Sequence, residues 1–280
     1  MPSRARPGRV LVVARHSFLA QHALAALSPA RVAAIGHDET LRPDLLDGVG
    51  CIVNFARDPM ARSDDYRLDE MDTDLRLARG IGKRDIAYVM LSSRKVYAPS
   101  EGPLSETSPT GPRDAYGRHK LAVERALRDL LGERLTVLRL ANIFGYERTP
   151  GRTTFVSLAL DRLAREGRIH YAMSPFVERD FLPVAAFARV LARIALAPPG
   201  GILNVGSGIG LPTGRLALWI LEGFGRGALV IESTEEKDPF VLDIARLTSL
   251  YGQPCSLADL RDACRAIGSR LAADLAQSSG

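Results

Sequence analysis

Short apolar runs alternate with longer segments of helical spacing through the first two thirds of the chain. The apolar runs, which we interpret as buried strands, cover residues 10–14, 32–35, 51–55, 86–91 and 135–140. Apolar residues recur at helical spacing over 18–27, 67–78 and 114–131. Strands that alternate with helices in this way predict a parallel sheet joined by crossover helices.

The pattern changes after Gly145, where helical spacing becomes dominant. The later helical segments are residues 155–166, 185–196, 211–221 and 257–266, with short strand-like pieces at 202–205 and 228–231. We therefore predict an α/β fold, in which a Rossmann-like doubly wound parallel sheet is followed by a smaller C-terminal lobe.

The composition is that of an ordinary globular protein, with 46% hydrophobic and 25% charged residues. No apolar run reaches the roughly 20 residues that span a bilayer, so we expect no membrane segment. The net charge of +5 is modest and is not clustered enough to indicate a nucleic-acid partner. The three cysteines, Cys51, Cys255 and Cys264, lack metal-site spacing, which favours reduced thiols in a cytoplasmic protein without a metal.

Tyr116 and Lys120 stand four residues apart on the helix that is predicted after a Pro-rich loop. At this spacing the two side chains share one face of the helix. A nearby ammonium lowers the pKa of a tyrosine, which prepares the phenol for proton transfer near neutral pH. The same pair also occurs on solvated helices without any catalytic role, so the spacing alone does not decide.

The surrounding sequence makes the pair more specific. Residues 91–127 read LSSRKVYAPSEGPLSETSPTGPRDAYGRHKLAVERAL, with a strand ending in Ser-Ser, then Val96-Tyr97, Glu106 in the loop, and Glu124 after the lysine. This run resembles the signature of the extended short-chain dehydrogenases/reductases, in the NAD-dependent epimerase/dehydratase family and its nucleotide-sugar branch.

The resemblance implies a catalytic trio and a division of the chain. Ser93 would orient the substrate oxygen, Tyr116 would be the acid/base, and Lys120 would hold the nicotinamide ribose. Residues 1–150 would form mainly a dinucleotide-binding Rossmann domain, and residues 151–280 mainly a substrate-binding lobe. The resemblance also allows some residues after 150 to belong to the first part, where the chain crosses back.

The resemblance continues after the trio and implies substrate-binding residues. Asn142 would face the substrate, and Arg179 would approach the nucleotide diphosphate. Two structural roles stay open, because Asn142 could cap the following turn and Arg179 could pair with Glu178 or Asp180. The further segments that resemble the family are residues 139–145, 178–181, 204–208 and 243–252.

The turn between the first strand and helix departs from the family pattern, which has glycines at the positions of Ala14, Ser17 and Ala20. Glycine permits a tight turn and close approach of the pyrophosphate, and a replacement with positive φ costs about 1 kcal/mol or more. The helix N-terminus would still attract phosphate, with added charge from Arg15 or His16. The cofactor-binding residues implied by the resemblance are Ala14, Arg15, His16, Ser17, Phe18, Leu19, Phe55, Ala56, Tyr116 and Lys120.

A second departure concerns the choice of cofactor. The acidic residue that binds the adenine ribose of NAD would stand near position 36, where this chain has Gly36. Its loss favours NADP over NAD, with Arg15 or Arg57 as candidates to receive the 2′-phosphate. Asp38 and Glu39 would repel that phosphate, so both cofactors stay open.

The residues after Ser93 narrow the reaction. Sugar-nucleotide 4,6-dehydratases place an Asp-Glu pair there, and this chain has Arg94-Lys95, so the sequence argues against elimination. The resemblance then implies an NAD(P)-dependent oxidoreductase that acts on a nucleotide-diphosphate sugar. A 4-ketoreductase is favoured over a 4-epimerase, because the altered turn suits an exchangeable cofactor and an epimerase must hold its cofactor through two steps.

A non-catalytic reductase-like binding protein that has lost cofactor binding is the competing interpretation. The missing glycines motivate it, and the intact trio opposes it. Family members often pair through the helix that carries the tyrosine and lysine, which implies a homodimer by analogy.

Overall fold

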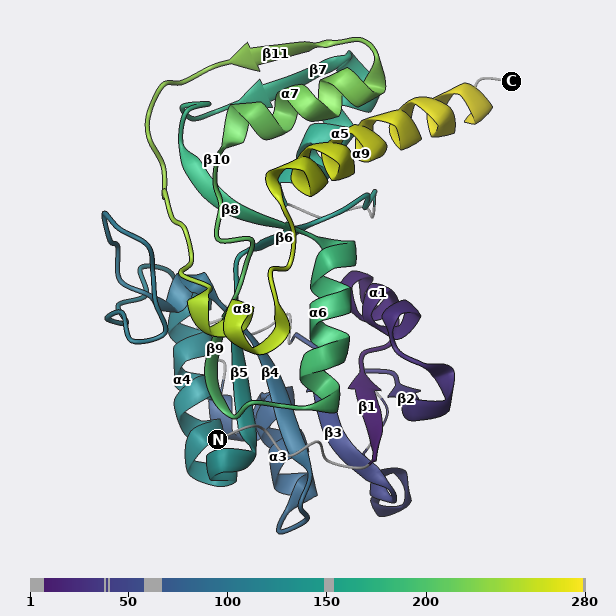
Figure 1. Cartoon of the computed structure of the whole chain (residues 1–280), viewed down its shortest axis with the longest axis vertical. Helices are drawn as coiled ribbons and strands as arrows, with labels where there is room; N and C mark the ends of the chain where they lie inside the picture. Colours follow the sequence, from purple (N-terminus) through teal and green to yellow (C-terminus); the bar gives the residue numbers. More distant parts are fainter. Residues whose placement is uncertain (1–7, 38, 40, 58–66, 149–153, 279–280) are drawn as a thin grey trace.

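The centre of the molecule is a parallel six-stranded sheet with the order β2-β1-β3-β4-β5-β9 (Figure 1). The structure is a computed structural model that describes residues 8–37, 39, 41–57, 67–148 and 154–278. All pairings between neighbouring strands of this sheet are parallel, which confirms the predicted Rossmann-like fold. The strands are β1 (Arg9–Val13), β2 (Val32–Ile35), β3 (Val49–Asn54), β4 (Ala87–Ser93), β5 (Leu135–Leu140) and β9 (Gly201–Val205).

Both faces of this sheet are buried. Along β1, Val12 lies in one apolar cluster, and the preceding Leu11 lies in a second cluster on the opposite face. Such continuous burial is why the strands read as unbroken apolar runs in the sequence. The covering helices are α1 (Phe18–Ala26) and α6 (Val184–Leu196) on the first face, and α3 (Thr73–Ile81) and α4 (Ala115–Leu131) on the second.

The chain reverses its direction of winding at β1, which lies between β2 and β3. It passes from β1 to β2 on one side and then returns to β3 on the other side, followed by β4 and β5. In an open parallel sheet, ligands bind outside the carboxyl ends of the strands at such a point. The residues that follow β1 and β3 therefore border the expected binding crevice.

The later part of the chain forms a lobe beyond the carboxyl ends of the main strands (Figure 1). This lobe contains a sheet of order β10-β8-β6 and a two-stranded sheet of β11 and β7. One strand, β9, leaves the lobe and pairs with β5, so the chain crosses back after residue 150. The remaining elements are α2 (Leu68–Met71), β6 (Asn142–Phe144), α5 (Phe155–Glu166), β7 (Arg168–Tyr171), β8 (Glu178–Pro183), β10 (Gly210–Pro212), α7 (Thr213–Phe224), β11 (Ala228–Ile231), α8 (Ala245–Tyr251) and α9 (Leu257–Ser278).

The long helix α9 packs along α7 with almost no space between the two backbones. A Cβ atom added to Gly268 would lie 2.0 Å from the carbonyl oxygen of Ile220, and one added to Gly223 would lie 2.0 Å from that of Arg265. Only residues without a side chain permit this approach. None of the described helices, α9 included, is long and apolar enough to cross a membrane.

Candidate active site

The two serines that end β4 have different surroundings. Ser92 is buried and donates a hydrogen bond from its hydroxyl to Glu124. Ser93 is half-buried at the wall of a cavity, and its Oγ accepts the backbone N–H of Lys95 at 3.2 Å. That bond belongs to a short 3-10 turn (Arg94–Val96), which fixes Ser93 at the end of the strand.

Helix α4 carries Tyr116, and its N-terminal end packs against this turn. Asp114 caps the helix by accepting the N–H of Gly117 at 2.7 Å, and its carboxylate also pairs with Lys95. A Cβ atom added to Gly117 would lie 2.3 Å from the carbonyl oxygen of Lys95. Glycine is needed beside Tyr116, because it lets the helix approach the end of β4 and places Tyr116 at the cavity that Ser93 lines.

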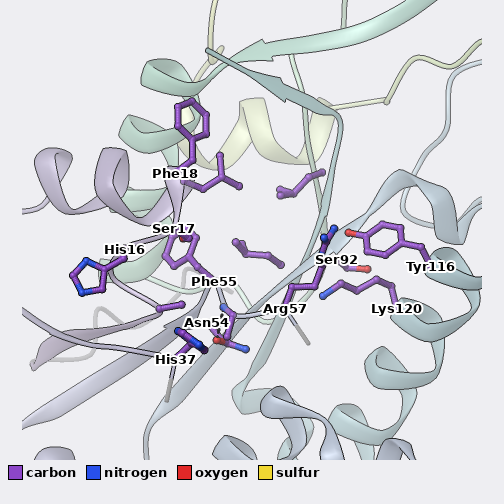
Figure 2. A pocket seen from close by; sticks show the side chains of 15 residues that line it. His16, Ser17, Phe18, His37, Asn54, Phe55, Arg57, Ser92, Tyr116 and Lys120 are labelled. Atoms are coloured by element: carbon purple, nitrogen blue, oxygen red, sulfur yellow. Dashed lines mark hydrogen bonds between the residues drawn. The ribbon is translucent and has the colours of Figure 1, made fainter. Parts of the chain in front are cut away.

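Two cavities meet at Tyr116, which lines both of them. The main cavity, of about 580 Å³, lies at the carboxyl ends of β1, β3 and β4 and contains Lys120 (Figure 2). The adjoining cavity, of about 480 Å³, contains Ser93, Asn142 and Arg179. The three predicted catalytic residues are therefore arranged around one junction.

A fully buried carboxylate, that of Asp74, lies near Lys120. Its Oδ1 accepts hydrogen bonds from Asn54 Nδ2 at 2.7 Å and from the Tyr88 hydroxyl at 2.6 Å. Burial raises the pKa of Asp74, although the charge of Lys120 acts in the opposite direction. Asn54 lines the main cavity, so its hydrogen bond to Asp74 holds this part of the cavity wall in place.

A second buried acid, Asp72, stands at the start of α3. Its carboxylate bonds His119 at 3.0 Å and accepts the N–H of Leu75 at 3.1 Å. Burial acts to raise the pKa of Asp72, but these hydrogen bonds lower it overall, and Lys120 adds to the lowering. Sequence reasoning missed both acids, although an Asp before a helix is a recognisable cap. No group of His, Cys, Asp and Glu among the described residues is arranged to hold a metal ion.

The altered phosphate turn keeps a usable shape. Only Ala14, of the three residues at glycine positions, has a left-handed φ, of 63°, while Ser17 caps the N–H of Ala20 inside α1. The N–H groups of Phe18 and Leu19 begin the helix, where no intrahelical acceptor is available, and such groups bind phosphate. With an open cavity in front of these N–H groups, the residues present fit a dinucleotide cofactor.

Arg15, which was expected to add positive charge at the phosphate turn, does not line the main cavity. Every predicted cofactor-binding residue lines the main cavity except Arg15, whose guanidinium bonds a carbonyl of β2 at 3.2 Å and pairs with Glu39 at 3.0 Å. The cavity wall also includes His37, Asn54 and Arg57. Arg57 is named from the sequence as a candidate for a 2′-phosphate, whereas His37 and Asn54 are marked in the sequence only by their position at the carboxyl end of a predicted strand.

Arg179 and Asn142 lie on neighbouring strands at the wall of the adjoining cavity. Asn142 belongs to β6, which pairs with β8, the strand that carries Arg179. The guanidinium of Arg179 donates to the backbone carbonyl of Lys237 at 2.5 Å and to that of Asp238 at 3.2 Å. Within the described part of the chain it forms no ion pair with the acids on either side of it in β8.

Arg94, which follows Ser93, is held over the adjoining cavity. Its guanidinium donates to Asp238 Oδ1 at 2.6 Å and lies 3.9 Å from the ring centre of Phe240. Burial acts to raise the pKa of Asp238, but the hydrogen bond and charge of Arg94 lower it overall. The acids near the turn after Ser93 are thus paired with basic residues, Asp238 with Arg94 and Asp114 with Lys95.

The other family-like segments form two buried hydrogen-bond clusters outside the cavities. Asn204 accepts the Tyr97 hydroxyl at 2.6 Å, and its backbone N–H donates to Glu106 at 3.0 Å. Asp180 accepts both the N–H and the hydroxyl of Ser207 at 2.8 Å. These residues connect the Pro-rich loop, β8 and the segment after β9, so their role is structural.

The comparison with protein families agrees with this arrangement. The model of the NAD dependent epimerase/dehydratase family matches residues 6–206, which is more than half of the chain. The chain belongs to the NAD-dependent epimerase/dehydratase family. The match includes the main sheet and the segments that carry Ser93, Tyr116 and Lys120. A search of curated proteins finds none that matches the chain.

Solved structures with the fold of this epimerase/dehydratase family match nearly the whole chain. "MoeE5 in complex with UDP-glucose and NAD" has a TM-score of 0.75 at 21% identity, covering 94% of this chain and 99% of that one. A UDP-N-acetylglucosamine 4-epimerase from Methanobrevibacter ruminantium M1 has a TM-score of 0.78 at 18% identity, covering 95% and 99%. RMD from Pseudomonas aeruginosa, complexed with NADPH, has a TM-score of 0.76 at 21% identity, covering 95% and 99%. At these identities the likeness shows a shared fold and leaves the reaction open.

Proposed function

We propose that this member of the family is an NAD(P)-dependent oxidoreductase that acts on a nucleotide-diphosphate sugar, as a 4-ketoreductase. The observation that carries the proposal is the position of Tyr116 at the junction of the two cavities. A phenol there can reach a cofactor on one side and a sugar oxygen on the other. Proteins of the same fold bind UDP-glucose with NAD, or NADPH, which supports both classes of ligand.

The chemistry divides among the three residues at the junction. A bound nicotinamide would supply the hydride for the keto carbon of the sugar. Tyr116, as the acid, gives its proton to the oxygen of that carbon, and Ser93 donates a hydrogen bond to the same oxygen. Lys120, one helical turn after Tyr116, holds the ribose of the cofactor in the main cavity.

The adjoining cavity suits the diphosphate of such a sugar. Its wall carries Arg94, Lys95 and Arg179. A guanidinium has five N–H donors, so Arg179 keeps donors for a phosphate beyond its bonds to the two backbone carbonyls. Asn142 supplies an amide that faces the sugar from β6. The cavity is therefore proposed as the substrate site.

One observation, the residue at the first glycine position of the phosphate turn, favours a reductase with an exchangeable cofactor. Ala14 brings a methyl group into the phosphate turn where glycine would leave room, which weakens the hold that a 4-epimerase needs. We also propose NADP over NAD, because Gly36 has no carboxylate and that of Glu39 is paired with Arg15. The complete trio argues against a non-catalytic binding protein.

Calorimetric titration with NADPH and NADH, followed by turnover with a 4-keto nucleotide sugar, tests the proposal. Tyr116→Phe should bind the dinucleotide like the wild type and lose about 10²–10⁴-fold in turnover, because only the transferred proton is removed. Tyr251→Phe is the matched control, since that hydroxyl bonds the carbonyl of Ala197 away from both cavities. Absence of dinucleotide binding, or full turnover by Tyr116→Phe, would refute the proposal.

Turnover assays that record both the sugar product and the consumption of dinucleotide separate a 4-epimerase from a 4-ketoreductase. A 4-epimerase would interconvert UDP-glucose and UDP-galactose without net consumption of dinucleotide. A 4-ketoreductase would consume NADPH or NADH in proportion to the sugar reduced.

A further inference from the structure

Arg57 is a guanidinium in the cavity wall that has no anionic partner among the residues that the structure describes. It follows β3, is exposed, and lines both the main cavity and the adjoining cavity. In Figure 2 its side chain points across the main cavity toward Tyr116. Across the described ranges of the chain, the Arg57 side chain forms no hydrogen bond or ion pair. A cation in this state is prepared to bind an anionic ligand.

Three other basic residues around the two cavities, Arg94, Lys95 and Arg15, are paired with acids. Arg94 is paired with Asp238, and Lys95 with Asp114. Arg15, the residue next to the phosphate turn, pairs with an acid after β2 and does not line the main cavity. Besides Lys120 on α4, the arginine that offers positive charge to a ligand of the main cavity is Arg57, on the β3 side of the crevice, and not Arg15 beside the turn.

The phosphate turn needs such help. Ala14 occupies its left-handed position with a nearly buried methyl group, and the hydroxyl of Ser17 is used to cap α1. What the turn still offers is the N–H groups of Phe18 and Leu19 at the start of the helix. Those groups and Arg57 line the same cavity.

We infer that Arg57 binds the diphosphate of the dinucleotide cofactor, from the side of the crevice opposite the start of α1. The inference rests on the proposed function. A planar guanidinium matches two phosphate oxygens at once, so it replaces contacts that a glycine-rich turn makes through its backbone. Arg57 is thus a cofactor-binding residue that compensates for the lost glycines.

The direction of the side chain separates this role from binding of a 2′-phosphate. The adenine ribose is expected at the end of β2, which His37 marks in the main cavity. Figure 2 shows Arg57 directed toward Tyr116 and away from His37. The diphosphate connects the adenine ribose to the nicotinamide ribose beside Lys120, so it lies on the side of His37 that Arg57 faces.

Calorimetric titration of the full chain with NADH, NADPH, ADP-ribose and UDP tests the inference. Arg57→Ala should weaken NADH, NADPH and ADP-ribose by about tenfold each, as expected for the loss of a charge-assisted hydrogen bond, and leave UDP unchanged. Arg57→Lys should retain part of the affinity, because it keeps the charge and loses the fork. Arg31→Ala, an exposed arginine at the amino end of β2, is the control and should change nothing.

Three results would overturn the inference while the proposed function stands. They are unchanged dinucleotide affinity in Arg57→Ala, a loss for NADPH alone, and a loss confined to UDP. If the wild type binds none of the dinucleotides, the proposed function fails first and the inference fails with it. The wild-type titration therefore tests the function, and the ratio between variant and wild type tests Arg57.

Discussion

The helix that carries Tyr116 and Lys120 is anchored to the sheet by one buried ion pair, and removing half of it is the most informative stability experiment. Glu124 of α4 and Arg139 of β5 are 1% and 3% exposed. Arg139 donates to Glu124 through Nη2 at 2.7 Å and through Nε at 3.3 Å, and Ser92 donates to the same carboxylate. Glu124→Ala would leave the guanidinium buried without its acid.

The expected loss follows from burial. Breaking a buried pair by removing one partner costs about 3–5 kcal/mol, because the remaining charge has neither water nor a counter-ion. For a chain of this size each kcal/mol lowers the midpoint of thermal unfolding by about 2–4 °C, so the shift should be about 6–20 °C. The ring of Tyr97, whose centre lies 4.6 Å from the Arg139 guanidinium, offsets only part of this cost.

Urea unfolding followed by circular dichroism measures this loss. The exposed Glu133→Ala serves as the control and should stay within about 0.5 kcal/mol of the wild type. The double variant Glu124→Leu/Arg139→Met should recover most of the stability, because an apolar pair of similar volume carries no desolvation cost. A loss below about 1 kcal/mol for Glu124→Ala would refute the argument that this pair is shielded from water.

Further predictions concern titration, thiols and the start of α4. Burial raises the pKa of Asp74, so stability should fall as the pH rises from about 4 toward its folded value, and Asp74→Asn should remove that decline in urea unfolding. Burial raises the pKa of Cys255 and Cys264 to about 12, so thiol reagents at pH 8 should modify them only at the rate of unfolding. Gly117→Ala should cost about 1–3 kcal/mol in thermal unfolding and also reduce turnover, because the new Cβ meets the Lys95 carbonyl; an unchanged midpoint would contradict the packing.

Periodicity predicted the strands of the main sheet because these strands are buried on both faces. Periodicity missed β8, because its polar start Glu178-Arg179-Asp180 gives no apolar run. Its partners, β6 and β10, come from distant parts of the chain, so no local pattern indicates the pairing either. The helix expected over 67–78 is divided into α2 and α3, because Asp72 is extended and caps the second helix.

The residues of the candidate site that belong to a sequence motif could be predicted. Ser93 and Tyr116 follow from the resemblance, and the structure places both at one cavity. Asp74 was not singled out from the sequence, and Arg57 was named only as a candidate for a 2′-phosphate, because the positions of both depend on the order of the strands and on which ends meet. The spacing of residues along the chain carries no information about that order.

The return of β9 to the main sheet limits how this protein can be recombined with its relatives. Residues 201–205 complete the sheet edge beside β5; α6, which covers the main sheet, precedes them, and β10, which belongs to the lobe, follows them. A graft that exchanged everything after residue 150 would also replace this edge strand and its packing. A chimera that changes only the substrate lobe therefore needs splice points before α6 and after β9.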